Sequence, residues 1–132
     1  MNMKDERQFV GYSKYRSRLV DGHVHTELCP HGSGDRTAMM IEKAIELRIE
    51  KVCLTEHAPL PTAFAAEYGG DKKAYDTASL KLNEVDTYLE LGRQLQRAYG
   101  THIDISLGFE VDYIPGFESD IQEFLDRYGP LT

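Results

Sequence analysis

The stretch VDGHVHTELCPHG, from Val20 to Gly32, holds three of the five histidines in a chain of 132 residues. Two of them, His23 and His25, are two positions apart, directly after a short apolar run. Because side chains alternate between the two faces of a strand, a His-x-His pair directs both imidazoles to one face. Proline and glycine residues follow the pair and indicate a loop. We therefore expect a strand over residues 18–25 that ends in histidines.

Downstream of this stretch, strand-like and helix-like segments alternate along the chain. Apolar residues spaced by three and four predict amphipathic helices, and short apolar runs predict buried parallel strands. Alternation of the two implies a parallel sheet or barrel with right-handed crossovers. The expected elements are a helix over 36–48 capped by Ser33 or Asp35, a strand over 51–55, a long loop over 56–76, a helix over 77–99 that Gly100 terminates, a strand over 102–113, and a helix from Gly116 or Glu118 to Tyr128 or Gly129.

Each predicted helix has one mainly apolar side that can face the sheet. Cys53, in the second strand, is expected in the core. The residues that share one side of each element are Ala38, Ile41, Ala44, Ile45 and Arg48 of the first helix, Leu82, Val85, Leu89, Gly92 and Leu95 of the second, and the alternating Ile103, Ile105, Leu107 and Phe109 of the third strand.

The composition is that of one modest globular domain, with 41% hydrophobic and 28% charged residues. A formal net charge of −7 argues against a nucleic-acid partner, since phosphate backbones bind basic faces. Two cysteines are too few for a disulfide framework, and no apolar run suits a membrane span or a signal core. We expect a cytoplasmic protein that binds neither nucleic acid nor membrane, with an N-terminal extension over residues 1–17 and one domain over 18–132.

Side chains that can bind metals or transfer protons gather where the predicted strands end. In parallel α/β folds, chemistry collects at the carboxyl ends of the strands, which meet on one edge of the sheet. The residues at these ends are His23 and His25 on the first strand, Glu56 and His57 after the second, and Glu110 and Asp112 on the third.

These residue types predict a metal centre. Imidazole nitrogens and carboxylate oxygens bind zinc, iron and similar divalent metals. Glu110 lies between Phe109 and Val111, where a carboxylate is costly to bury unless a cation faces it. His102 precedes its strand, at the opposite end, and is left out. The candidate ligands are His23, His25, His31, His57 and Glu110.

Other interpretations stay open for several positions. His31 could be an exposed loop histidine, and His57 could be a hydrogen-bonding histidine at a strand end. Glu56 and Asp112 either orient a ligand histidine or are solvated. Cys29 could bind a metal through its soft sulfur, although a small loop residue is the favoured interpretation.

Clustered metals suggest a reaction. Two or more bound metal ions can lower the pKa of a bound water and neutralise charge on a phosphoryl group. The sequence has no glycine-rich phosphate loop and no evident Ser-His-Asp or Cys-His arrangement. We therefore expect a metal-bound hydroxide as the nucleophile, with Glu110 and His57 as catalytic residues.

Three segments resemble a known family. The segments DGHVHTELCPHG (21–32), VCLTEHAPLP (52–61) and LGFEVDY (107–113) are similar to the first three motifs of the PHP (polymerase and histidinol phosphatase) superfamily, and most similar to its histidinol-phosphatase branch. The resemblance covers roughly residues 20–132. It implies an α/β fold of parallel βα units in a distorted (β/α)7 barrel. It also implies hydrolysis of L-histidinol phosphate to L-histidinol and phosphate in histidine biosynthesis.

The resemblance further implies a site of up to three divalent metal ions, such as zinc, manganese or iron. His23 and His25 would hold the first ion, and Glu110 would bridge the first and the second. His31 and His57 would hold the third. The substrate would be a small phosphorylated molecule.

The family pattern continues with more histidines on later strands and a closing Asp-x-His, whereas this sequence ends at RYGPLT, after about three βα units. We therefore expect an incomplete barrel with an exposed sheet edge. A truncated product, a shortened protein, and a half that pairs with another chain each fit this pattern; a homo-oligomer could cover the edge. The alternative functions are another PHP-type phosphoesterase and a non-catalytic, metal-binding half domain.

The long loop that follows His57 is a further candidate feature. Residues 58–75 include Phe64 and Tyr68 and leave the edge where the site is expected. Long loops in compact domains are often functional. Two interpretations are equally favoured: a lid over the substrate pocket and an ordinary surface connection.

Overall fold

A computed structural model describes residues 18–67 and 71–131 of the chain. Its three strands are β1 (Val20–Val24), β2 (Lys51–His57) and β3 (Asp104–Glu110). They form one parallel sheet in the order β1-β2-β3, so each strand pairs with its neighbour in sequence. This confirms the predicted α/β class with a parallel sheet.

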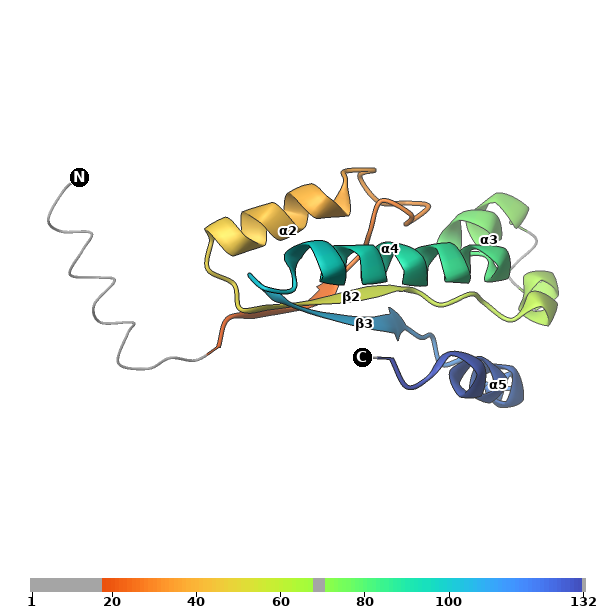
Figure 1. Cartoon of the computed structure of the whole chain (residues 1–132). Coiled ribbons are helices and arrows are strands. Elements are labelled where there is room, and N and C mark those ends of the chain that lie inside the picture. Colours follow the sequence, from red (N-terminus) through yellow and green to blue (C-terminus); the bar gives the residue numbers. More distant parts are fainter. Residues whose placement is uncertain (1–17, 68–70, 132) are drawn as a thin grey trace, which may run out of the picture.

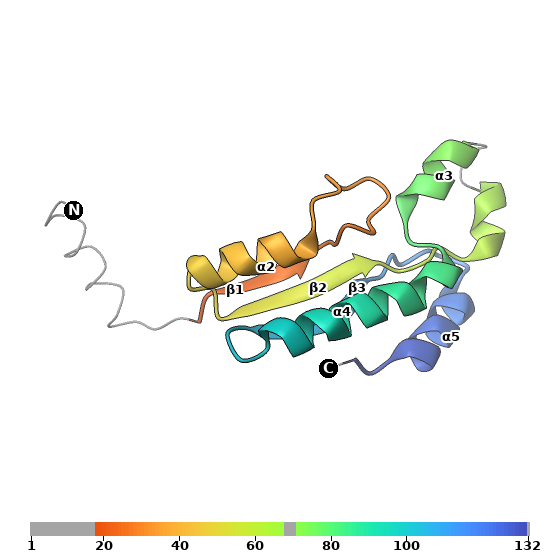
Figure 2. The ribbon, with the colours of Figure 1, turned by 45° about the horizontal axis from the view of Figure 1, so that its top comes forward.

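Two helices, α2 (Thr37–Glu46) and α4 (Val85–Tyr99), cover one face of this sheet (Figure 1). Each connects two parallel strands, which is why both lie on the same side. The remaining elements are η1 (Thr62–Glu67), α3 (Lys72–Ala78), η2 (Leu82–Glu84) and α5 (Glu118–Tyr128). Figure 2 shows α3 beyond the carboxyl ends of the strands, and α5 close to the end of β3.

The hydrophobic core lies between the sheet and these two helices. Tyr88 of α4 is fully buried, and its hydroxyl lies 2.9 Å from the carbonyl oxygen of Leu54 and 2.7 Å from that of Gly108. Burial raises the pKa of Tyr88 to about 12. Helix α4 approaches β3 closely at Gly92, where a Cβ atom would collide with Leu107. The other buried core residues are Ile41, Ala44, Val52, Leu80, Val85, Leu89, Leu95, Ile103 and Ile105.

The pairing of the strands sets the positions of their polar ends. Strands β2 and β3 pair without a register shift, which places His57 opposite Glu110. The pairing of β1 with β2 shifts between Asp21 and Val24, so β1 has one extra residue there. Such irregularities re-aim side chains and are common beside functional sites. His23 lies within this irregular step.

The predicted first helix is shorter than expected and has a different cap. Helix α2 ends at Glu46, and Arg48 is exposed with φ of 60°, so Arg48 is not on the buried side. Neither Ser33 nor Asp35 caps the helix, since the N-cap residue is Arg36; the side chains of Ser33 and Asp35 hydrogen bond to each other. Glu27 takes the capping role instead.

The region predicted as a loop and a long helix is also organised differently. The expected loop over 56–76 contains η1 and part of α3, and the expected helix over 77–99 begins only at Val85. Ser79 is extended and interrupts the helix, and buried Leu80 donates its N–H to the carbonyl oxygen of His57. Leu82 lies before α4 and is 54% exposed, so it does not share the buried side of this helix as predicted. Gly100 does terminate α4.

Cys53, which was predicted in the core, lies on the second face of the sheet, away from the two helices. Cys53 alternates with buried Val52 and Leu54, so it is half-buried on this face and outside the core cluster. On the same face, Lys51 forms an ion pair with Asp104 at 3.3 Å. Among the described helices, none is long and apolar enough to cross a membrane.

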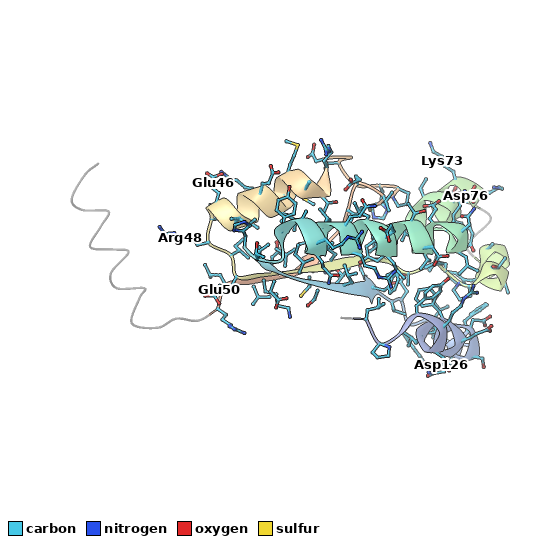
Figure 3. The ribbon with its side chains drawn as sticks, viewed as in Figure 1. Glu46, Arg48, Glu50, Lys73, Asp76 and Asp126 are labelled. Atoms are coloured by element: carbon cyan, nitrogen blue, oxygen red, sulfur yellow. The ribbon has the colours of Figure 1, made fainter. Side chains whose placement is uncertain are left out.

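The labelled charged residues in Figure 3 mark the two ends of the sheet. Glu46, Arg48 and Glu50 lie at the end where the strands begin, away from α3 with its Lys73 and Asp76. The polar cluster described next is at the opposite end, where β2 and β3 finish. The predicted extension, residues 1–17, and Tyr68 of the predicted lid lie outside the described residues.

Candidate metal centre

The first group of donor atoms comes from the ends of β1 and β3. The Nε2 atoms of His23 and His25 lie 2.8 Å and 2.9 Å from Oε2 of Glu110. The two Nε2 atoms are 3.0 Å apart. Ligands bound at about 2.0–2.1 Å in a tetrahedral site are separated by about 3.3 Å, so one cation between these atoms requires only small shifts.

The second group joins the loop after β1 to the end of β2. The Nε2 atoms of His31 and His57 face each other at 3.1 Å. Nδ1 of His31 lies 2.8 Å from the carbonyl oxygen of Thr77, which can only accept a hydrogen bond. The ring proton of neutral His31 is therefore on Nδ1, and its Nε2 presents a lone pair toward His57.

The two groups are in contact through His57 and Glu110. Nδ1 of His57 lies 3.4 Å from Oε2 of Glu110. If Nδ1 donates to this carboxylate, Nε2 of His57 also presents a lone pair, and two lone pairs then face each other. A cation between His31 and His57 removes that conflict, because both nitrogens become ligands.

The pKa shifts favour the ligand forms of both residues. Burial lowers the pKa of His57, and nearby His25 and His31 lower it further, against the opposing charge of Glu110. Burial alone would raise the pKa of Glu110, but hydrogen bonds from His23 and His25 and the charge of His57 lower it below its ordinary value. At neutral pH a neutral imidazole therefore faces an ionised carboxylate, the forms that metal binding needs.

The donor set fits divalent cations. The five predicted ligands come from three strand ends and one loop and form two adjoining groups. The described residues contain two clusters of possible metal ligands, and within each cluster the donor atoms lie within 4.8 Å of one another. Imidazole with carboxylate suits zinc, iron and manganese. The clusters are His23, His25 and Glu110, and His25, Cys29, His31 and His57.

A match to a known protein family covers most of this region. The sequence model of the PHP domain matches residues 21–130, which include every residue of both clusters. The chain belongs to the PHP domain family. The predicted resemblance to this family is thereby confirmed.

Proteins similar to this PHP domain carry related names. "Histidinol-phosphatase" of Bacillus subtilis (strain 168) is 38% identical over 110 residues, which are 83% of this chain and 39% of the relative. "Probable histidinol-phosphatase" of Deinococcus radiodurans is 26% identical over 110 residues, 83% of this chain and 38% of the relative. A crystal structure of a proposed histidinol phosphatase from Listeria monocytogenes has a TM-score of 0.79 at 40% identity, covering 83% of this chain and 40% of that one.

The PHP chain thus spans about two fifths of the length of the curated relatives that it matches. The matched part holds three parallel strands and both donor groups.

Two residues left open by the sequence are placed by the structure. Glu56 is fully buried rather than solvated, and its Oε1 accepts hydrogen bonds from the N–H and the hydroxyl of Thr26. It therefore holds the backbone beside His25 instead of bonding to a ligand ring. Asp112 is exposed, two residues beyond β3, and belongs to neither donor group. His102 precedes β3 at the far end, as expected.

A second anchor supports the loop that carries His31. The Oε2 atom of Glu27 accepts hydrogen bonds from the N–H and hydroxyl of Thr37, at the first residue of α2. Burial alone would raise the pKa of Glu27, but these hydrogen bonds lower it below its ordinary value. Glu27 and Glu56 therefore hold the start of the loop to α2 and β2.

Two further residues contribute to the cluster. Cys29, for which the sequence favoured a plain loop residue over a metal ligand, lies with its sulfur 3.5 Å from Nδ1 of His25. The signal for Cys29 in the sequence was its spacing, four residues after His25 and two before His31. Thr77 contributes through its carbonyl oxygen, for which a sequence carries no signal.

Phe64 of the predicted lid packs against Phe117, with ring centroids 5.5 Å apart.

Proposed function

We propose that this PHP chain forms part of a metal-dependent phosphomonoester hydrolase of the histidinol-phosphatase type. The reaction is L-histidinol phosphate plus water to L-histidinol plus phosphate. The observation that carries the proposal is the convergence of four histidines and Glu110 from three strand ends and the loop after β1. The names of the relatives from Bacillus subtilis and Deinococcus radiodurans support this choice of substrate.

In this proposal the described strands are the first three βα units of a distorted (β/α)7 barrel, and residues 18–132 are one part of its domain. Up to three divalent ions bind in the complete site, with zinc, manganese and iron as the candidates. His23 and His25 hold the first ion, and Glu110 lies between the first and second. His31 and His57 hold another.

Bound divalent cations neutralise charge on a phosphoryl group and lower the pKa of water, which supplies the hydrolytic chemistry. The chain's own residues prepare that site. The carboxylate of Glu110 contributes the negative charge, and the lowered pKa of His57 leaves this ring neutral at neutral pH. The carbonyl of Thr77 keeps Nε2 of His31 free of its proton.

The substrate and the partner follow from charge and topology. The net charge of −7 disfavours a polymeric nucleic acid and leaves a small phosphorylated molecule as the substrate. Strand β1 is at an edge of the sheet, and Leu19 and Val20 there are 55% and 50% exposed. We therefore include a second copy of the chain as a partner that covers an open edge.

Elemental analysis of the purified chain, together with its mass in solution, tests the metal centre. We expect bound divalent metal, less of it in Glu110→Gln, and no change in His102→Ala, whose histidine lies at the opposite end of β3. Equal metal content in all three proteins would contradict the proposed ligands.

A substrate panel tests the reaction. Phosphate release from histidinol phosphate, reduced in Glu110→Gln and unchanged in His102→Ala, is the expected result. Preference for an oligonucleotide would favour another PHP phosphoesterase. Tightly bound metal without turnover of any phosphoester would favour the non-catalytic domain.

A further inference from the structure

We propose that the sulfur of Cys29 is a ligand of the ion held by His31 and His57, which makes this second group a Cys-His-His site. The inference rests on the metal centre proposed above and adds a donor to it. Three protein ligands with an open position are typical of catalytic zinc sites.

Distances place the sulfur among the donors. One donor atom each from His25, Cys29, His31 and His57 lies within 4.8 Å of the others. Sulfur and nitrogen ligands bound at about 2.3 Å and about 2.0 Å in a tetrahedral site are about 3.6 Å apart. The side-chain movements needed to close the group around one ion are therefore about an ångström.

The surroundings of Cys29 do not suit a mere space-filling residue. Its side chain is buried, at 8% exposure, yet it is outside the hydrophobic core cluster. Its sulfur instead faces a ring nitrogen of His25. A buried sulfur that points into a group of imidazoles, rather than into apolar side chains, is placed as a ligand.

The ring of His25 gives the sulfur a second role. Nε2 of His25 faces His23 and Glu110, so as a ligand it carries no proton. A neutral imidazole then has its proton on Nδ1, which lies 3.5 Å from Sγ of Cys29 and donates to it. The sulfur thereby fixes the orientation of a ligand in the first group while it binds the ion of the second.

The backbone holds the sulfur in this position. The N–H of Cys29 donates to the carbonyl oxygen of Thr26 at 3.1 Å, and the N–H of Gly32 donates to that of Cys29 at 3.2 Å. Thr26 is itself bound by buried Glu56. The turn around Cys29 is therefore tied to β2, the strand that carries His57.

A thiolate ligand changes which metal this group prefers. Soft sulfur favours zinc over manganese, whereas the nitrogen and oxygen atoms of the first group suit both. Binding of the ion replaces the thiol proton, which leaves to solvent. The two groups would thus differ in metal preference within one site.

Titration of the metal-free full chain with Co²⁺ tests the inference, because thiolate bound to Co²⁺ gives a sulfur-to-metal charge-transfer absorption in the near ultraviolet. We expect this band in the unchanged chain and in Cys53→Ser, the matched control. In Cys29→Ser the band should disappear, and the affinity of the second group for Co²⁺ should fall. The fall should be at least roughly 10- to 100-fold, the loss typical when a residue that only hydrogen bonds to a ligand is removed.

The outcomes separate this inference from the proposed function. Saturating Co²⁺ bound by the unchanged chain without the band overturns the role of Cys29 and leaves the histidine ligands intact. A band that persists in Cys29→Ser overturns it as well. Absence of any Co²⁺ binding by the unchanged chain overturns both proposals. If Cys29→Ser fails to fold, the spectrum of Cys53→Ser decides, because Cys29 is then the one cysteine left in the chain: a band supports Cys29 as a ligand, and Co²⁺ bound without the band overturns it.

Discussion

Replacement of Glu56 tests how the loop before His31 is held. In Glu56→Ala, the buried N–H and hydroxyl of Thr26 lose their acceptor. Each lost hydrogen bond costs about 0.5–1.5 kcal/mol, and a buried donor left unpaired costs about 1–3 kcal/mol. With the space left by the side chain, the free energy of unfolding should fall by about 3–5 kcal/mol.

Glu56→Gln is the matched control, because its amide oxygen can still accept both hydrogen bonds. Among the described residues, none donates to Oε2 of Glu56, so the new amide nitrogen replaces an atom without a hydrogen bond. The expected loss in the free energy of unfolding is about 1–2 kcal/mol, because the amide nitrogen of the glutamine is a buried donor that needs an acceptor. The glutamine variant should therefore stay closer to the unchanged chain than the alanine variant.

Urea unfolding of the metal-free chain, followed by circular dichroism, measures both losses. Removal of metal matters, since a bound ion adds its own stabilisation to the folded state. A loss below about 1 kcal/mol in Glu56→Ala, or one no larger than in Glu56→Gln, would refute this role of Glu56, because the hydrogen bonds to Thr26 would then contribute little.

Three further predictions concern the same fold. Tyr88→Phe removes a buried hydroxyl that bonds to β2 and β3, and should cost about 1–3 kcal/mol in urea unfolding; an unchanged midpoint would contradict this. Gly92→Ala should lower the melting temperature, because overpacking against Leu107 costs about 1–3 kcal/mol and better helix propensity returns only about 1; a higher melting temperature would refute it. The lowered pKa of Glu27 stabilises the fold above its ordinary pKa, and this contribution is lost as pH falls through the folded value. The stability difference between the unchanged chain and Glu27→Gln should therefore shrink in acid, and a constant difference would exclude this role.

The strand ends were predictable because their signals are local. His23 and His25 follow one apolar run, and His57 and Glu110 end two others, so period-two alternation and parallel topology bring them to one edge. The core side of α4 was predictable for the same reason, except for Leu82, which precedes the helix.

Other contacts could not be predicted, because they join distant residues. The cap of α2 comes from Glu27, ten positions before Thr37. The path of the loop around Cys29 depends on a buried carboxyl group in β2, which a sequence pattern cannot distinguish from a solvated one. The helices between β2 and α4 are short, and the prolines and glycines around them indicated a loop.

The hydrogen bond between His31 and the carbonyl of Thr77 has a consequence for how this protein tolerates change. The acceptor belongs to the main chain, so an amino-acid exchange at position 77 leaves it in place. Insertions or deletions between β2 and α4 move it. Side-chain substitution at position 77 would therefore miss this contact, while small changes in the length of the segment would alter a histidine on a different strand connection. At position 77, evolution is therefore constrained in the path of the main chain more than in the type of residue.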